Sequence, residues 1–280
     1  MSGGVVITGA STGIGEATAL KLDAAGFRVF AGVRKAEDGE RLRAKASDRL
    51  RVIQPLDVTD HDSITHAAAL VESELGGEPL TGIVNNAGIA TGGPLEALDL
   101  DDLRSTLEVN SIAPVAVAQA FLPMLRRSRG RIVNISSIGG RVAQPFAGPY
   151  ITSKHALEGI NDVLRLELIE WDIDVIAIEP GTIATPIWEK GSSQAGEVLG
   201  KMAPRMRELY GKRLEKFSKV LERQTKRGAP PEKVADAVHK ALTSDRPRAR
   251  YLIGDAYVLL ALKTVLPTRL LDRVFYKLTS

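Results

Sequence analysis

The stretch Gly4-Val-Val-Ile-Thr-Gly-Ala-Ser-Thr-Gly-Ile-Gly15 sets an apolar run, a glycine-rich turn and the start of a helical pattern in direct succession. The run over 4–8 predicts a short buried strand, and the pattern over 16–25 predicts a helix. Glycines let a backbone approach a phosphate, and the first helical turn offers it unpaired N–H groups. This order favours a nucleotide-phosphate site over a plain strand-to-helix connection, although the spacing is T-G-x-x-x-G-x-G and not G-x-G-x-x-G. The residues expected to contribute are Gly9, Ser11, Thr12, Gly13, Ile14 and Gly15.

Apolar strands alternate with helical patterns along most of the chain. Further strands are predicted over 29–33, 51–55, 82–85, 131–136, 175–179 and 251–253, and further helices over 64–75, 115–125, 155–171 and 232–242. Such alternation predicts a parallel sheet with helices on both faces. Right-handed crossovers then make it a doubly wound, Rossmann-type α/β fold. A chain of 280 residues can bury one large core, so a single domain over 1–280 is expected.

The composition narrows the range of functions. The chain has no cysteine, which excludes disulfides and thiolate chemistry. Its four histidines are scattered, and His61 and His66 are expected on a solvated helix face, so no catalytic metal is predicted. The net charge of +3 comes from dispersed residues, and no motif reads bases, which argues against a nucleic-acid partner.

No targeting or membrane-spanning segment is expected. The first strand begins at residue 3 or 4, which leaves no room for a signal peptide. The longest apolar run at the C-terminal end, Ala256–Leu262, is far shorter than the roughly 20 residues that cross a bilayer. A cytoplasmic location is therefore the expectation.

The run Tyr150-Ile-Thr-Ser-Lys154 places a tyrosine and a lysine on one face of a helix. A free phenol, with a pKa of about 10, is a poor acid or base at neutral pH. An ammonium group one turn away favours the phenolate and brings that pKa toward the working range. A single pair of this kind is more often a solvated face, but Tyr150 is the only one of five tyrosines with a lysine at this spacing. We therefore interpret the pair as a proton-transfer device.

Other polar candidates follow the predicted strands, at the edge where an open α/β sheet builds its site. The segments Leu56-Asp-Val58, Asn85-Asn-Ala-Gly88, Ile135-Ser-Ser137 and Pro180-Gly-Thr-Ile-Ala-Thr185 each lie at a strand end, and Asn110 approaches a helix. With the glycine turn and the Tyr150–Lys154 pair, these motifs resemble the short-chain dehydrogenase/reductase family from Thr8 to about Thr185.

The resemblance implies a catalytic tetrad of Asn110, Ser137, Tyr150 and Lys154. Ser137, not Ser136, stands thirteen residues before the tyrosine, as the family pattern requires. Hydride would move between a carbinol carbon and a nicotinamide, while Tyr150 exchanges a proton with the oxygen and Ser137 hydrogen-bonds it. Lys154 would lower the tyrosine pKa and hold the nicotinamide ribose, and Asn110 would position a water. The resemblance also implies cofactor contacts from Asp57, Val58, Asn86, Ala87, Gly88, Tyr150, Lys154, Pro180, Gly181, Ile183 and Thr185.

The choice between NADP and NAD depends on the end of the second strand. An NAD enzyme usually places an acidic residue there to bind the adenosine ribose. Here Val33 holds that position and Arg34 follows, a guanidinium suited to a 2′-phosphate, to which Ser11 could add a donor. The alternative is that Arg34 only starts a solvated helix. NADP is favoured, and an NAD-dependent alcohol dehydrogenase remains the alternative.

The region 186–231 departs from the alternation, because it is helical and charged. Its apolar stripe indicates either a core-facing helix or a lid over a substrate pocket. The stripe consists of Leu199, Met202, Met206, Leu209, Leu214, Phe217 and Leu221. With the nearby Pro145-Phe-Ala147 and Ile187-Trp188, it suggests an apolar pocket. A lid of this length resembles that of the steroid- and retinol-oxidising branches.

The expected function is NADP(H)-dependent interconversion of a hydrophobic alcohol and its carbonyl by a homo-oligomer, either dimer or tetramer. The C-terminal extension, 255–280, could pack on the lid, form a dimer contact or touch a membrane peripherally, with packing as the default expectation. Two alternative classes remain. A non-catalytic NADP(H)-binding regulatory protein would lack turnover, and a sugar-nucleotide epimerase would carry a larger C-terminal substrate domain.

Overall fold

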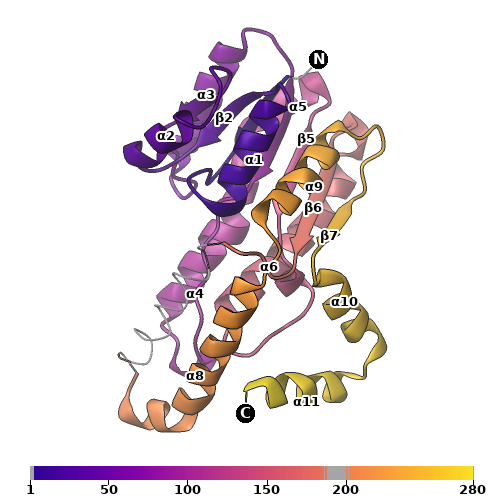
Figure 1. The fold of residues 1–280 in the computed structure, drawn as a ribbon. Helices are drawn as coiled ribbons and strands as arrows, with labels where there is room; N and C mark the ends of the chain where they lie inside the picture. The colour runs from indigo at the N-terminus through magenta and orange to yellow at the C-terminus, as the bar shows by residue number, and fades with distance from the viewer. Residues whose placement is uncertain (1–2, 186, 188–199, 201, 280) are drawn as a thin grey trace.

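The computed structural model of the protein describes residues 3–185, 187, 200 and 202–279. Within them, seven parallel strands form one sheet in the order β3-β2-β1-β4-β5-β6-β7 (Figure 1). The strands are β1 (Gly4–Ile7), β2 (Arg28–Gly32), β3 (Arg51–Ile53), β4 (Leu80–Asn85), β5 (Arg131–Ile135), β6 (Asp174–Pro180) and β7 (Arg250–Ile253). The predicted Rossmann-type α/β fold is thereby confirmed.

Helices cover both faces of the sheet. On one face lie α1 (Gly13–Ala24), α2 (Ala36–Arg43) and α9 (Pro231–Thr243), whose apolar side chains share a buried cluster. On the other face lie α3 (His61–Leu75), α5 (Ala113–Ser128) and α6 (Gly148–Glu167). Successive strand residues serve opposite clusters, so Val5 and Ile7 pack with α1, while Val6 packs with α3 and α5. This two-sided burial explains why the strands are apolar without alternation.

The helix that precedes β5 contains a π-helical turn. Helix α4 (Leu100–Leu107), the turn Glu108–Ile112 and α5 follow one another directly. Together they form a helix, Leu100–Ser128, that is long and apolar enough to cross a membrane by length and composition. Its apolar residues Val117, Phe121 and Leu125 are buried against the sheet, which is the environment of a core helix.

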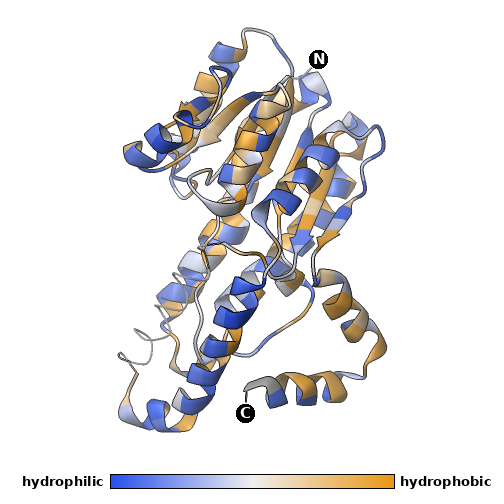
Figure 2. Ribbon diagram, in the orientation of Figure 1, coloured by the Kyte–Doolittle hydropathy of each residue, from blue (hydrophilic) through white to orange (hydrophobic). Residues whose placement is uncertain are grey.

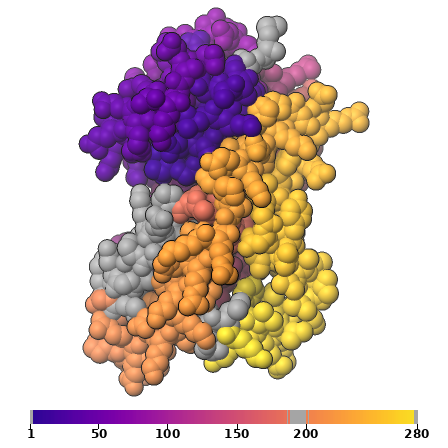
Figure 3. Space-filling model, in the orientation of Figure 1, coloured from indigo at the N-terminus to yellow at the C-terminus, as the bar shows by residue number. Residues whose placement is uncertain are grey.

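Among the described residues, further helices lie beyond the carboxyl edge of the sheet. They are α8 (Pro204–Lys226), α10 (Ala256–Val265) and α11 (Thr268–Thr279), and α11 lies against α8 (Figures 1 and 3). Figure 2 shows hydrophobic and hydrophilic residues side by side on α11, whereas α8 is mostly hydrophilic on the side turned to the viewer. The region predicted as helical and charged is therefore a helix over 204–226, and the extension folds as two further helices.

Two element boundaries differ from the prediction in ways that affect the site. Helix α6 begins at Gly148, before the predicted start at His155, so Tyr150 and Lys154 both lie inside it. Pro149 explains the early start, because its fixed φ and missing N–H suit the first helical turn. The helix ends at Glu167, and a 3₁₀ turn over Ile169–Trp171 completes the predicted range.

Candidate active site

The turn between β1 and α1 has the backbone conformation that its glycines predict. Gly9 and Gly13 have φ values of 66° and 60°, which a side chain disfavours. A Cβ at Gly15 would lie 2.3 Å from the carbonyl oxygen of Gly9, so the helix packs directly on the turn. The residue before α1, Thr12, makes no side-chain cap, which leaves the first N–H groups of the helix for a ligand. These features fit a pyrophosphate.

Asn86 braces this turn from the end of β4. Its amide nitrogen donates hydrogen bonds to the carbonyl oxygens of Thr8, at 3.0 Å, and Gly9, at 2.9 Å. The hydroxyl of Thr8 accepts hydrogen bonds from the backbone N–H groups of Asn86 and Ala87, both at 3.0 Å. This segment, expected to contact the cofactor, therefore also holds the ends of β1 and β4 together.

The ends of β2 and β3 bring Arg34 and Asp57 near each other. Arg34 is exposed just after β2. Hydrogen bonds from the N–H and hydroxyl of Thr59 hold the pKa of Asp57 below its usual value, and the charge of Arg34 adds to this effect. Sequence reasoning missed Arg41 on α2, whose guanidinium donates to the carbonyl oxygen of Ser11 at 2.8 Å. Arg41 thus contacts the glycine turn, and Arg34 lies near Asp57.

Asn110 lies in the π-helical turn and is buried. Its side-chain oxygen accepts from the N–H of Ile89 at 2.9 Å, and its nitrogen donates to the carbonyl oxygen of Ile89 and to the hydroxyl of Ser153. Ser153 lies between Tyr150 and Lys154 on α6. Asn110 therefore ties the loop after β4 to the helix that carries the proton-transfer pair.

Ser137 follows β5 and forms a hydrogen bond with Tyr150. Its hydroxyl oxygen also accepts the N–H of Gly139 at 3.0 Å, which fixes the turn in place. Burial raises the pKa of Tyr150, and the hydrogen bond with Ser137 offsets part of this rise. The net direction is opposite to the lowering that the sequence led us to expect from Lys154, because Tyr150 is almost fully removed from water.

Lys154 lies one turn after Tyr150 and is also buried. Its ammonium group donates to the carbonyl oxygen of Ile135 at 2.8 Å and lies 5.8 Å from the centre of the tyrosine ring. Burial lowers the pKa of Lys154 to about 8, and the charge of Glu158 acts against this lowering. The structure thus brings Ser137, Tyr150 and Lys154 together, as expected.

The loop after β6 carries the last of the expected cofactor contacts. Pro180 ends the strand, the N–H of Gly181 donates to Ile253, and Ile183 and Thr185 are buried. Sequence reasoning missed Asp255, which precedes α10. Asp255 fills the space beside Gly181, where a Cβ would lie 1.8 Å from its carboxylate oxygen.

Phe146, four residues before Tyr150, joins the site to α8. It is buried in a separate apolar cluster with Met202 and Leu214, against which Met206 and Phe217 pack. Its ring lies 5.7 Å from that of Phe217. The ring also lies 5.3 Å from the guanidinium carbon of Arg213, and the same guanidinium covers the ring of Tyr276 of α11. Met202, Met206, Leu214 and Phe217 of the proposed lid stripe therefore face the segment next to Tyr150, whereas Leu209 is exposed and Leu221 is not part of this cluster. Leu199 and most of 186–201 lie outside the described residues.

Two further observations bear on the location of the site. A pocket lined by Asp174, Val175 and Arg248 lies at the amino ends of β6 and β7, opposite to the edge that carries the candidate residues. Within the described ranges, no three histidine, aspartate or glutamate side chains gather as metal ligands. The chemistry-bearing groups therefore concentrate at the carboxyl edge.

Comparison with known proteins identifies the class. The family model described as short chain dehydrogenase matches residues 4–196, and the chain belongs to this family. It is 35% identical to "NADPH-dependent 3-dehydrocapnine reductase" of Ornithobacterium rhinotracheale, covering 97% of this chain and 95% of the relative. It is 38% identical to "Retinol dehydrogenase 16" of Mus musculus, covering 97% of this chain and 87% of the relative.

A solved structure supports the same assignment. A short chain dehydrogenase from Burkholderia cenocepacia, crystallised in complex with NADP, is 25% identical and superposes with a TM-score of 0.74 over 97% of each chain. The protein is thus a dehydrogenase that acts on CH–OH groups with NAD(P), as the sequence resemblance implied.

Proposed function

We propose that the protein interconverts a hydrophobic alcohol and its carbonyl with NADP(H), using Tyr150 as the acid and base. The observation that carries this proposal is the contact of Ser137 with Tyr150 one helical turn from Lys154, at the same sheet edge as the glycine turn. A substrate oxygen beside Tyr150 and Ser137 would find one group that transfers a proton and another that donates a hydrogen bond. The nicotinamide, when bound, exchanges hydride with the substrate carbon.

The residues around the site suit that cofactor. Gly9, Gly13 and the first turn of α1 would hold the pyrophosphate, with Ser11, Thr12, Ile14 and Gly15 completing the turn. Asp57, Val58, Asn86, Ala87 and Gly88 would form the adenosine side. Lys154 would bind the nicotinamide ribose, and the loop Pro180–Thr185 would hold the carboxamide. Asn110 is assigned to position a water, which its remaining acceptor capacity allows.

NADP is proposed over NAD because cationic groups surround the expected position of the 2′-phosphate. Arg34 is exposed there, and Arg41 reaches the glycine turn from α2. A guanidinium binds phosphate through paired, charge-assisted hydrogen bonds. The acidic groups beside these arginines are already engaged, Asp57 by Thr59 and Asp38 by Arg41 at 2.8 Å. A relative that is NADPH-dependent by name agrees with this choice.

An apolar substrate is proposed because the side chains next to Tyr150 are apolar. Phe146 and the α8 stripe form a cluster that is separate from the two clusters of the sheet. A pocket wall of this kind favours large hydrophobic alcohols over small polar ones. The likeness to a retinol dehydrogenase points the same way.

A panel assay tests the reaction and separates the alternatives. NADPH or NADH absorbance is followed with a retinal-type aldehyde, a ketosteroid and a small polar ketone. We expect turnover of the apolar carbonyls with NADPH. Tyr150→Phe keeps the ring and should lower kcat by roughly 10²–10⁴-fold, the usual contribution of a positioned acid–base group, with cofactor affinity unchanged in calorimetry. NADPH binding without turnover of any carbonyl would support a regulatory protein instead.

We also propose that the outer face of α10 and α11 contacts a membrane peripherally. Residues on this face are apolar and exposed, namely Tyr257, Val258, Leu262, Val265, Leu270 and Val274. Arg269, Arg273 and Lys277 on α11 add charge that suits anionic headgroups. The inner sides of the two helices pack on Ile138, Val142 and α8.

Sedimentation with vesicles tests this contact. The protein should pellet with vesicles of phosphatidylcholine and phosphatidylserine, and a Val258→Glu/Val265→Glu variant should not. Ile112→Glu, at an exposed apolar residue outside α10 and α11, is the matched control and should still bind. Failure of the wild type to bind, with dissociation of a dimer in the α10 variant, would assign the face to a second copy of the chain.

A further inference from the structure

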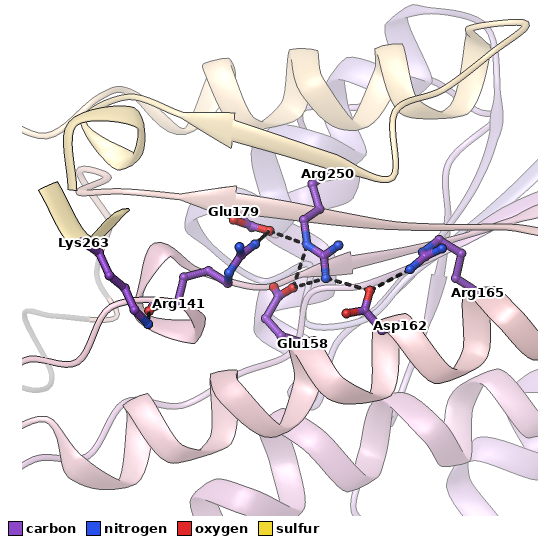
Figure 4. A network of polar contacts seen from close by, with 7 residues as sticks. All are labelled: Arg141, Glu158, Asp162, Arg165, Glu179, Arg250 and Lys263. Carbon is purple, nitrogen blue, oxygen red and sulfur yellow. Dashed lines mark hydrogen bonds and ion pairs between the residues drawn. The ribbon is translucent and has the colours of Figure 1, made fainter. Parts of the chain in front are cut away.

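A network of charged side chains includes Glu158 of α6, the helix that carries Tyr150 and Lys154 (Figure 4). At its centre is Arg250 of β7, whose guanidinium bonds Glu158 at 3.1 Å, Asp162 at 2.8 Å and Glu179 at 2.9 Å. Glu179 of β6 also pairs with Arg141 at 3.4 Å. The network joins α6, β6, β7 and the segment that follows Ser137, although no residue of it is in the site predicted from the sequence.

Glu158 is the member of this network nearest the chemistry. It follows Lys154 by four residues and Tyr150 by eight, so the three lie along one face of α6. One carboxylate oxygen of Glu158 accepts two hydrogen bonds from Arg250, at 3.2 and 3.1 Å. The other is buried and accepts no hydrogen bond from the described residues. Such an oxygen is costly unless a nearby positive charge compensates it.

The backbone holds Glu158 and Lys154 in a fixed relation to Ser137. A Cβ at Gly140 would lie 2.8 Å from the carbonyl oxygen of Lys154 and 2.9 Å from Cγ of Glu158. The turn that starts at Ser137 therefore touches α6 between these two residues. Arg141, the next residue, is held by Glu179 through its side chain, and its carbonyl oxygen accepts a hydrogen bond from Lys263 of α10 (Figure 4).

The charges around Lys154 explain why its ammonium form persists. Lys154 is buried, which disfavours its charge. Its own helix supplies Tyr150, Glu158 and the half-exposed Asp162, while neighbouring elements supply Glu179 from β6, Arg250 from β7 and Arg141 after β5. Arg250 is bonded to Asp162 and Glu179 as well as to Glu158, and Arg141 is bonded to Glu179. The charge of Glu158, one helical turn further along α6, acts against the effect of burial on the pKa of Lys154.

We propose that Glu158 is a positioning residue for the reaction: its carboxylate, fixed by Arg250, keeps Lys154 charged beside Tyr150. The inference rests on the proposed role of Tyr150 and Lys154 in proton transfer. Glu158 touches neither of the expected reactants, so its effect passes through Lys154.

Direct titration of Lys154 tests the proposal without turnover. Lysine is labelled with ¹³C at Cε in the full-length protein, and the resonance of Lys154 is assigned by its loss in Lys154→Met. We expect a midpoint of about 8 in the wild type. Glu158→Gln keeps the shape and an acceptor for Arg250 but removes the charge, so the midpoint should fall by at least about half a pKa unit. Asp162→Asn, which removes another carboxylate bonded to Arg250, is the matched control and should leave the midpoint unchanged.

The pH profile of turnover supplies the second measurement. The alkaline decline of kcat for alcohol oxidation should move to lower pH in Glu158→Gln by the same amount as the lysine midpoint. An unchanged midpoint in Glu158→Gln, or an equal fall in Asp162→Asn, overturns the proposal. If no alcohol or carbonyl is turned over by the wild type, the proposed function fails, while the titration still decides whether Glu158 acts on Lys154.

A double variant keeps the proposal testable if Glu158→Gln does not fold. If Glu158→Gln is unfolded, Lys154→Met/Glu158→Gln removes both partners and should fold, because no buried ammonium is left without its carboxylate. A double variant that is also unfolded overturns the pairing of the two residues.

Discussion

Asp255 accepts two hydrogen bonds from Thr182, one from the backbone N–H at 2.7 Å and one from the hydroxyl at 3.0 Å. The two residues are far apart in the sequence, and together they fasten the start of α10 to the loop after β6. This loop is the proposed carboxamide site, so a contact of the C-terminal extension shapes the cofactor end of the active site.

Asp255→Ala should weaken cofactor binding without unfolding the protein. The variant loses a carboxylate that accepts two hydrogen bonds, each of which contributes about 1.5–3 kcal/mol when one partner is charged. We expect the Kd for NADPH to rise by roughly tenfold, since part of that energy is regained by water. Calorimetry measures the change. The Kd of Asp255→Asn, which keeps one acceptor, should lie between those of the wild type and Asp255→Ala. A lower Tm with an unchanged Kd would contradict a role at the cofactor.

Arg34→Ala should weaken NADPH binding by about 1.5–3 kcal/mol, the range for hydrogen bonds to charged groups, and leave NADH binding almost unchanged. The reason is that only NADPH carries the 2′-phosphate. Fluorescence titration with each cofactor measures both affinities. Lys35→Ala removes the neighbouring exposed charge and serves as the control. Equal losses for the two cofactors would show that Arg34 does not bind the 2′-phosphate.

Met206→Gln and Phe217→Gln should raise KM for hydrophobic carbonyls with little change in Tm. Both side chains are partly buried against the cluster of Phe146, not in the core of the sheet. Leu209→Gln, at an exposed position of the same helix, is the control. Hydrogen exchange across 204–226 should slow when cofactor and substrate bind. If both variants unfold, and if hydrogen exchange across 204–226 does not change when ligands bind, the stripe belongs to the core.

The stability of the protein should rise with pH because of Lys154. Its pKa is about 8 in the folded protein and about 10.4 in the unfolded chain, so between these values the unfolded chain binds more protons. The free energy of unfolding should therefore increase above about pH 8, by an amount on the order of 2–3 kcal/mol by about pH 10. Below about pH 8 both states hold the proton, and Lys154 adds no slope.

Urea unfolding at about pH 7.5 and about pH 9.5 measures this contribution. Lys154→Met has no titrating group at the position, so the rise should be absent from the variant. A rise of equal size in the wild type and in Lys154→Met would show that other groups cause it.

The parts of the site that the sequence predicted are those formed by local spacing. The glycine turn lies within twelve residues, and Tyr150 and Lys154 are one helical turn apart, so a short stretch contains all their information. The strands were predicted because burial on both faces makes them continuous apolar runs. The start of α6 was missed because the helix begins at Gly148 and Pro149, two residues that usually interrupt helices.

Contacts between residues far apart in the sequence cannot be predicted from local spacing. Glu158 and Arg250 are 92 residues apart, and each looks like an ordinary surface charge in the sequence. The direction of the Tyr150 pKa was also mispredicted, because spacing reveals the neighbouring lysine but not the depth of burial. Asp255 and Arg41 were missed for the same reason, since only the folded backbone brings them to the loops that they hold.

The direct contact of Gly140 with α6 affects how precisely the turn after Ser137 is spaced from that helix. Where side chains separate two segments, the gap between them varies as the side chains change rotamer. Here main-chain atoms meet the helix directly, so the spacing between the serine turn and the tyrosine helix is set by covalent geometry and van der Waals radii alone. Even a methyl group at this position would act as a wedge, and it would part the two halves of the proton-transfer apparatus before it disturbed the rest of the fold.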